Sequence, residues 1–360
     1  MILFFSSPIG LGHITRDIAI MDKIKRFYGY NNFGFVTGST AFDVISKINN
    51  SFYNHMLSTS NLYNPPNFSV IDGKLVHGFL WVLKYLYYYH NCKNHLKKFF
   101  YSGSCQNVFP DLIVSDEDFA SLRFTKGLGI KRVFVTDVLN TRFGKSFLFS
   151  QFEKVLNHSM CNLIKSSECV ILPEFGEDKD NFFYVGPIVR EIHSTREALR
   201  KKLSFDRTTI LVSTGGTDAG LYLLRKTIES FSRIKNNSEC ELVILSTRYA
   251  ELPKSIKCRY LGITGNGHEF VQAADLVISL GGKSTIDECM VYGTPGIFIP
   301  IKNHFEQEHR ANLVGFKYDD IFKLDGLIEE KLCSVRNNRV EKVDNGVSKA
   351  AKIIYQILNN

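Results

Sequence analysis

His13 is the side chain in the first half of the chain that is best suited to proton transfer. It follows Gly10 and Gly12, where an apolar segment, Ile2–Ser6, gives way to an amphipathic one. A histidine in the first turn of a helix lies at the positive end of the helix dipole, which disfavours the imidazolium. We therefore expect His13 to be a neutral base, beside glycine N–H groups that can bind an anion or a polar substrate. The alternative is a histidine that only caps or packs the helix.

Three consecutive acidic residues end another apolar segment of the first half. They are Asp116, Glu117 and Asp118. One of these carboxylates could orient His13, or it could take a substrate proton itself. The run also contains an Asp-x-Asp pair, a pattern that can bind a divalent cation together with a diphosphate. A metal site is therefore an alternative that the run leaves open.

The second half carries two glycine-rich loops, each between a predicted strand and a predicted helix. Helix N-termini bind phosphate groups through backbone N–H groups and the helix dipole, so we expect a diphosphate at these loops. Glu288, one turn into the second helix, could accept hydrogen bonds from both hydroxyls of a ribose. The alternative is a carboxylate that only matches the helix dipole. The residues expected at the diphosphate are Gly216, Thr217, Gly281, Gly282, Lys283, Ser284 and Thr285.

Short apolar runs alternate with amphipathic stretches along the chain, which predicts α/β units with parallel strands. Two such series meet near residues 184–190, so we expect two Rossmann-like domains that face each other across a cleft. The first would span residues 1–186 and be completed by a C-terminal helix, 346–360, and the second would span residues 187–345. A single long sheet is the alternative. Predicted strands are Ile2–Ser6, Phe33–Thr37, Asp111–Ser115, Lys131–Thr136, Thr209–Ser213, Leu242–Ser246, Cys258–Leu261, Leu276–Ser279 and Gly296–Ile299. A capping box, Ser194-Thr-Arg-Glu197, predicts a helix start.

Composition excludes several classes of protein. Of 360 residues, 44% are hydrophobic and 22% charged, which is unlike a disordered chain, a collagen-like repeat or a coiled coil. No apolar run reaches the ~18 residues of a spanning helix, and the first residues do not resemble a secretion signal. Eight cysteines without a CxxC pair indicate a reducing compartment. The net charge of +8 fits phosphate-bearing ligands or anionic lipid, whereas nucleic acid would need a clustered basic run.

One segment, residues 75–101, combines many aromatic rings with lysines. Such a helix can lie in a bilayer surface, with its rings at headgroup depth and its lysines on anionic lipid. The alternative is a helix that faces the core and keeps its lysines in water. The residues expected to contact the membrane are Trp81, Lys84, Tyr85 and Tyr88.

Two sets of residues resemble the GT-B glycosyltransferases. The chain is similar to the bacterial peptidoglycan lipid-intermediate N-acetylglucosaminyltransferase, to its archaeal relatives, and to the two-subunit eukaryotic enzyme that adds the second N-acetylglucosamine to dolichol diphosphate. The motifs occur in both halves and in the family's order. They are Gly10-Leu-Gly-His13 and Leu280-Gly-Gly, Glu288, Gly293-Thr-Pro295, Pro300, Gln307 and Asn312.

The resemblance implies an inverting transfer from a UDP-sugar that needs neither a metal nor a cofactor. N-acetylglucosamine is the expected sugar, and a saccharide on a polyprenyl or dolichyl diphosphate is the expected acceptor. The protein would then be cytoplasmic and peripheral on the cytoplasmic face of the membrane. The first domain would bind the acceptor at Gly10, Gly12 and His13, and Asp118 would partner His13, with Glu117 and Asp116 as alternatives.

The resemblance also assigns donor contacts in the second domain. Gly216 and Thr217 would lie near the diphosphate, Gly262 and Ile263 near the uracil, and Glu288 at the ribose. Gln307 would contact sugar hydroxyls. Lys283-Ser284 stands where the bacterial enzyme has apolar or small residues, and that enzyme's double glutamine is absent. Two alternatives share this architecture: a non-hydrolysing UDP-N-acetylglucosamine 2-epimerase and a non-catalytic subunit that binds a nucleotide-sugar.

Overall fold

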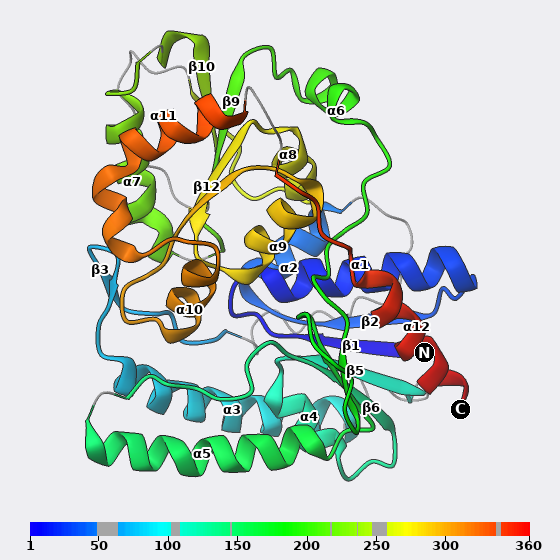
Figure 1. The fold of residues 1–360 in the computed structure, drawn as a ribbon. Helices are drawn as coiled ribbons and strands as arrows, with labels where there is room; N and C mark the ends of the chain where they lie inside the picture. The colour runs from blue at the N-terminus through cyan, green and yellow to red at the C-terminus, as the bar shows by residue number, and fades with distance from the viewer. Residues whose placement is uncertain are drawn as a thin grey trace. The chain divides into compact units, whose positions relative to one another are not determined.

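The computed structural model describes residues 1–48, 64–101, 109–144, 146–216, 218–235, 237–246, 258–335 and 340–360. The chain folds into two compact units, each built on a parallel sheet (Figure 1). Unit 1 comprises Met1–Asn67, His77–Arg190 and Asn345–Asn360, and unit 2 comprises Phe68–Val76 and Glu191–Asp344. The predicted α/β class with two parallel sheets is confirmed.

The sheet of unit 1 has six parallel strands, ordered β2-β1-β5-β6-β7-β8. Its central strands are buried on both faces, which explains why they read as continuous apolar runs in the sequence. The strands are β1 (Ile2–Ser6), β2 (Phe33–Val36), β5 (Leu112–Asp116), β6 (Lys131–Val135), β7 (Cys169–Leu172) and β8 (Phe182–Tyr184). The helices are α1 (Gly12–Tyr28), α2 (Ser39–Lys47), α3 (Gly78–Tyr101), α4 (Phe119–Thr125), α5 (Phe147–Lys165) and α12 (Val347–Asn359).

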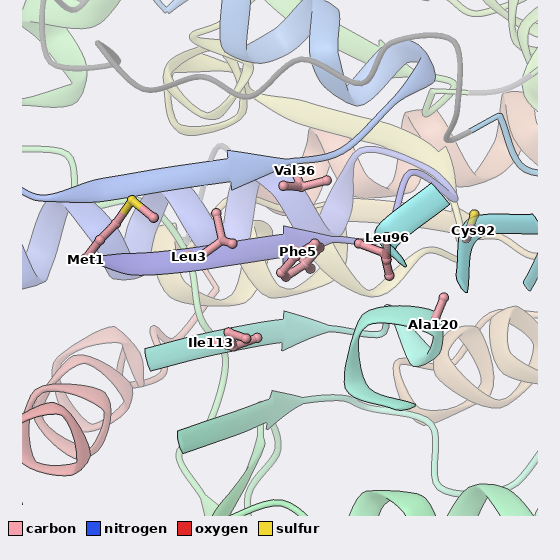
Figure 2. Close-up of a cluster of buried hydrophobic side chains, with 8 residues drawn as sticks. All are labelled: Met1, Leu3, Phe5, Val36, Cys92, Leu96, Ile113 and Ala120. Atoms are coloured by element: carbon pink, nitrogen blue, oxygen red, sulfur yellow. The ribbon is translucent and has the colours of Figure 1, made fainter. Parts of the chain in front are cut away.

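One hydrophobic core cluster of unit 1 lies between this sheet and the helices α3 and α4. Figure 2 shows the side chains of β1, β2 and β5 directed toward Cys92 and Leu96 of α3 and Ala120 of α4. On the other side of the unit, α1 packs against α12, and the rings of Tyr28 and Tyr355 stack at 4.0 Å. The last helix of the chain therefore completes unit 1.

The sheet of unit 2 has five parallel strands, ordered β11-β10-β9-β12-β13. The crossover from β9 to β12 at the centre of this order brings two strand–helix turns to the same edge of the sheet. The strands are β9 (Thr208–Ser213), β10 (Cys240–Leu245), β11 (Cys258–Tyr260), β12 (Leu276–Leu280) and β13 (Gly296–Ile299). The helices are α6 (Arg196–Leu203), α7 (Leu221–Phe231), α8 (Gly267–Ala273), α9 (Lys283–Tyr292), α10 (Phe305–Leu313) and α11 (Leu324–Val335).

A short hairpin from the first half of the chain belongs to unit 2, unlike the predicted assignment of residues 1–186 to one domain. It is formed by β3 (Val70–Ile71) and β4 (Lys74–Leu75). Leu75 N–H donates to the carbonyl of Lys302 at 2.8 Å, and Lys302 N–H donates to the carbonyl of Gly73 at 2.9 Å. The hairpin therefore supports the loop that follows β13.

The predicted strands lie within two residues of the observed ones, but besides the hairpin β3–β4 three further elements differ. The strands β7 and β8 were not predicted, and the helix α6 is capped by Thr195, whose side chain accepts from Ala198 N–H, and not by Ser194. Among the helices that the structure describes, none has both the length and the apolar character that crossing a bilayer requires.

Candidate active site

The candidate reacting centre of unit 1 lies where β1, β5 and β6 end. These strands are neighbours and parallel, so their carboxyl ends meet at one edge of the sheet. After β1, Gly10 takes a left-handed conformation with φ of 85°, and α1 begins at Gly12. This turn places His13 in the first turn of α1, next to the end of β5.

Asp116 is the carboxylate that contacts His13. Its Oδ1 lies 2.8 Å from Nδ1 of His13, and its side chain is fully buried. Burial alone would raise the pKa of Asp116, but the charges of Arg16 and His13 hold it below its ordinary value. Asp116 therefore stays ionised, fixes the ring of His13, and leaves Nε2 as the nitrogen that can meet a substrate.

Asp118 has a different role from the predicted one. It is the N-cap of α4, and its Oδ1 accepts from Ser121 N–H at 2.7 Å. Burial raises its pKa to about 6, although the hydrogen bonds to Ser121 oppose the shift. The structure thus gives Asp116, and not Asp118, the place beside His13, because the N-cap geometry turns the Asp118 carboxylate toward its own helix.

Glu117 lies on the other side of the His13 ring. Its backbone is left-handed, with φ of 48°, which is uncommon for a residue with a side chain. The carboxylate is anchored through Oε1, which accepts from Thr136 Oγ1 and from Asp137 N–H, both at 3.0 Å. Its other oxygen, Oε2, lies 3.7 Å from His13 Nε2. A strained backbone thus holds a second carboxylate next to the nitrogen that would meet the substrate.

The expectation that His13 is neutral is wrong. Burial lowers the pKa of His13, but the charges of Asp116 and Glu117 and the hydrogen bond to Asp116 outweigh it, and the pKa rises to about 9. The two close carboxylates dominate the helix dipole, whose effect is worth only ~0.3–1 kcal/mol in ordinary positions. His13 is therefore an imidazolium at neutral pH and becomes a strong base above pH 9.

Sequence reasoning missed two residues of this centre, Arg16 and Asp137. Arg16 Nε donates to Asp116 Oδ2 at 2.8 Å, and its Nη1 donates to Asp137 Oδ1 at 3.2 Å. The spacing of Arg16 from His13, three residues along one helix, was a usable signal because such residues share a helix face. Asp137 follows β6 much as Asp116 ends β5, so the order of the strands was needed to find it.

In unit 2, the predicted diphosphate loops lie at the same edge of the sheet. The turn that contains Gly216 follows β9, and Gly281 and Gly282 follow the neighbouring strand β12. The N-cap of α9 is Gly282, which has no side chain. The first N–H groups of α9 therefore receive no hydrogen bond from an N-cap side chain. Thr217 lies outside the described residues. Gly262, with φ of 66°, and Ile263 follow β11 at this edge, and Ser284, Thr285 and Glu288 are half-buried on α9.

Two predicted donor contacts are engaged within the protein. Lys283 Nζ lies 3.0 and 2.9 Å from the carboxylate oxygens of Asp287, one turn along α9, so its charge is balanced there. Gln307 Oε1 accepts from Ile301 N–H at 3.1 Å. A Cβ on Gly281 would lie 2.8 Å from the carbonyl of Gln307, so only glycine lets the turn after β12 approach α10 this closely. The structure thus brings Gly281 and Gln307 together.

The predicted membrane residues of α3 are mostly packed inside unit 1. Trp81 Nε1–H donates to the carbonyl of Pro66 at 3.0 Å, and its ring stacks on Tyr85 at 5.4 Å. Burial raises the pKa of Tyr85, and Tyr88 packs against the core cluster of Figure 2. Of the four, Lys84 alone is exposed. Among the side chains of α3 that the structure describes, the exposed large hydrophobic ones are others: Phe79, Leu80, Leu83, Tyr87 and Tyr101.

Part of unit 2 is similar to a known family of domains. Residues 209–325 match the glycosyltransferase family 28 C-terminal domain. This part of unit 2 is therefore similar to a glycosyltransferase domain. It contains the two glycine loops after β9 and β12 and Glu288, so the residues predicted to bind a donor fall inside the matched region, as does Gln307.

The curated relatives are distant. An uncharacterized glycosyltransferase of Methanopyrus kandleri is 24% identical over 215 residues, which cover 56% of this chain and 60% of that protein. A UDP-N-acetylglucosamine–N-acetylmuramyl-(pentapeptide) pyrophosphoryl-undecaprenol N-acetylglucosamine transferase of Desulforamulus reducens is 28% identical over 155 residues, 37% of this chain and 41% of that one. The chain thus spans about three fifths of the Methanopyrus protein.

Solved structures share the fold over the whole chain. A UDP-glucosyltransferase of Polygonum tinctorium superposes with a TM-score of 0.58 at 13% identity and covers 100% of this chain and 98% of that one. The calicheamicin glycosyltransferase superposes with a TM-score of 0.57 at 13% identity, covering 99% and 98%. The fold is GT-B.

The charges around His13 predict an unusual titration. We expect the His13 resonance, assigned by its loss in His13→Asn, to titrate near pH 9 in NMR spectra. Asp116→Asn should lower the pKa by about two units and Glu117→Gln by about one, because each removes a carboxylate charge. Asp118→Asn is the matched control, since asparagine caps helices as well as aspartate does. A wild-type pKa near 6.5, or an equal shift in Asp118→Asn, would contradict this electrostatic account.

Proposed function

We propose that this protein transfers a sugar from a UDP-sugar to a saccharide carried on a polyprenyl or dolichyl diphosphate. The sugar is N-acetylglucosamine, and the transfer inverts the anomeric carbon without a metal ion. The observation that carries the proposal is the His13–Asp116 pair at the carboxyl edge of one parallel sheet, in a chain whose other unit carries a glycosyltransferase domain. The name of the Desulforamulus relative supports the donor and the type of acceptor.

The chemistry assigned to unit 1 is general base catalysis. As the acceptor oxygen forms a bond to the anomeric carbon, its proton passes to Nε2 of His13. The bond between that carbon and the UDP oxygen breaks, and its electron pair leaves with UDP. With a pKa of about 9, about one His13 in a hundred is neutral at pH 7, but that fraction is a strong base. Asp116 stabilises the imidazolium that forms.

The chemistry assigned to unit 2 is recognition of the donor and stabilisation of the leaving diphosphate. The N–H groups at the start of α9, after Gly282, would face the growing negative charge on UDP. Lys283 contributes less than the sequence suggested, because Asp287 balances its charge. Glu288 would bind the ribose hydroxyls. Gln307 would donate from its amide nitrogen to a sugar hydroxyl, since its oxygen already accepts from Ile301.

The two assignments predict different kinetic defects. His13→Ala should lower kcat by about 100- to 10,000-fold with little change in the Kd of UDP-N-acetylglucosamine, because it removes the base. Glu288→Ala should weaken UDP-N-acetylglucosamine binding by about 10- to 100-fold, because it removes hydrogen bonds to a charged group. Titration calorimetry and radiolabelled transfer to a lipid extract measure the two effects.

The controls for this test are His158→Ala and Glu330→Ala, exposed residues on α5 and α11 that should behave as wild type. Equal activity of His13→Ala and the wild type would refute the assignment of the base. Formation of a new UDP-sugar without any acceptor would favour the epimerase. Donor binding without transfer to any lipid acceptor would favour a non-catalytic subunit.

The lipid acceptor would bring the protein to the cytoplasmic face of a membrane, and unit 1 has a surface suited to that contact. We define the α3–α5 apolar surface by Leu80, Leu83, Phe147, Leu148 and Val155. Their side chains are between 41% and 82% exposed. Figure 1 shows α3 and α5 running next to each other, and Phe79 and Phe149 join them with ring centroids 4.8 Å apart.

The charges of these two helices favour an anionic bilayer. α3 contains four lysines and no acidic residue. The one acid of α5, Glu153, is buried and accepts hydrogen bonds from the N–H groups of Phe143 and Gly144, whereas Lys154 beside it is exposed. Exposed apolar side chains flanked by cations are typical of surfaces that insert at the level of lipid headgroups.

This surface predicts lipid-dependent binding. The wild type should sediment with phosphatidylglycerol-rich vesicles and less with phosphatidylcholine vesicles. The double variant Leu148→Gln, Val155→Gln should bind at least about tenfold more weakly, because it removes two apolar side chains from the interface. The control is Leu313→Gln, Phe322→Gln, which removes two other exposed apolar side chains, both from unit 2. Equal losses in both double variants would refute the assignment to α3 and α5.

A further inference from the structure

Arg16 is a buried cation of unit 1 that two carboxylates contact. It lies one turn after His13 in α1, and its side chain is 8% exposed. A buried guanidinium is costly unless carboxylates and hydrogen bonds compensate it. Two carboxylates do so here, and they come from the ends of two neighbouring strands, β5 and β6. Arg16 therefore links α1 to both strands at the point where His13 stands.

The contacts of Arg16 fix the plane of one carboxylate. Its Nε donates to Asp116 Oδ2 at 2.8 Å, and its Nη2 donates to Asp116 Oδ1. The same Oδ1 is 2.8 Å from His13 Nδ1. A guanidinium fork that binds both oxygens of a carboxylate restricts its rotation, which a single ammonium cannot do. The orientation of the His13 ring therefore depends on Arg16 through Asp116.

The other side of the guanidinium is anchored as well. Nη1 of Arg16 donates to Oδ1 of Asp137 at 3.2 Å, and the backbone N–H of Asp137 donates to Glu117. The network thus continues from Arg16 to the carboxylate near Nε2 of His13. One arginine supports the carboxylates on both sides of the ring.

We propose that Arg16 is a positioning residue for the transfer reaction, which holds Asp116 so that Nδ1 of His13 is occupied and Nε2 receives the acceptor proton. The reaction itself rests on the proposed function, whereas the control of the His13 ring rests on the contacts described above. Nothing in this role requires Arg16 to touch a substrate.

Arg16 also limits the charge that gathers around His13. Its Nη2 lies 3.3 Å from Nδ1 of His13, and this cation opposes the imidazolium, whereas Asp116 and Glu117 favour it. Asp17, next along α1, is buried against Ser6, and burial together with the charge of Asp116 raises its pKa well above the ordinary value. The raised pKa disfavours the charged form of Asp17 beside His13. Removal of the Arg16 charge should therefore make His13 harder to deprotonate.

Two substitutions separate the effect of the positive charge of Arg16 from the effect of its two hydrogen bonds to the Asp116 carboxylate. Arg16→Met removes both, so the pKa of His13 should rise by at least about one unit above that of the wild type, and kcat should fall at least about 100-fold at pH 7.5. Arg16→Lys keeps the charge and loses the two-point contact. Its His13 should titrate within about half a unit of the wild type, while kcat still falls about 10- to 100-fold. The KM of UDP-N-acetylglucosamine should change less than about threefold in both.

The matched control is Arg132→Met, which removes another buried arginine of unit 1. Arg132 donates to the carbonyls of Leu122 and Ser166 and has no contact with His13. If Arg16→Met does not fold, Arg16→Lys and Asp137→Asn carry the test, and Asp137→Asn should lower kcat about 3- to 10-fold because it weakens the contact between Asp137 and Arg16.

The proposal is overturned if the Arg16 variants match Arg132→Met in kcat and in the NMR titration of His13. The titration needs no turnover, so a shifted His13 pKa in a protein without transferase activity would refute the proposed function and leave in place only the control of the His13 ring by Arg16.

Discussion

A fully buried carboxylate at the end of a central strand is the constraint on which unit 1 depends. Asp116 ends β5 with its side chain removed from water, and an ionised carboxylate in that position is stable only if cations meet it. Arg16 and His13 supply them, and both come from the first turns of α1. The register between β1 and β5, which pairs Ser6 with Asp116, sets the distance at which α1 can begin. Electrostatic compensation and sheet geometry therefore require the same arrangement.

The two units would use different physical means in the proposed transfer. Unit 1 concentrates charged side chains around His13, the proposed base. Unit 2 presents backbone N–H groups. Its strands β9 and β12 are each followed by a glycine turn, and Gly282 leaves the first N–H groups of α9 without a side-chain cap. Lys283, the lysine at the start of α9, forms an ion pair with Asp287, which balances its charge. Backbone N–H groups suit a nucleotide diphosphate because they can bind its charge without the reorganisation that mobile side chains need.

The sequence was informative where one local pattern determined the structure. Buried apolar runs located β1, β5, β9 and β12, and the glycine turns located the loops that follow them. It was less informative where tertiary contacts decide. The short strand β8 has no extended apolar run in the sequence, and the hairpin β3–β4 joins unit 2 through hydrogen bonds to Lys302. Asp118 caps a helix, whereas Asp116, two residues earlier, contacts His13. The pKa of His13 could not be deduced because it depends on two carboxylates about 100 residues away in sequence.

The central claim is that His13 acts as a base whose strength is set by its carboxylate neighbours. The most direct measurement is the pH dependence of kcat/KM for transfer from UDP-N-acetylglucosamine, compared between the wild type and Glu117→Gln. We expect the wild-type kcat/KM to rise about tenfold per pH unit until the pH approaches the His13 pKa near 9. In Glu117→Gln this rise should occur at lower pH, because the variant lowers the pKa of His13. A kcat/KM that falls as His13 loses its proton, or one that rises over the same pH range in both proteins, would contradict the account.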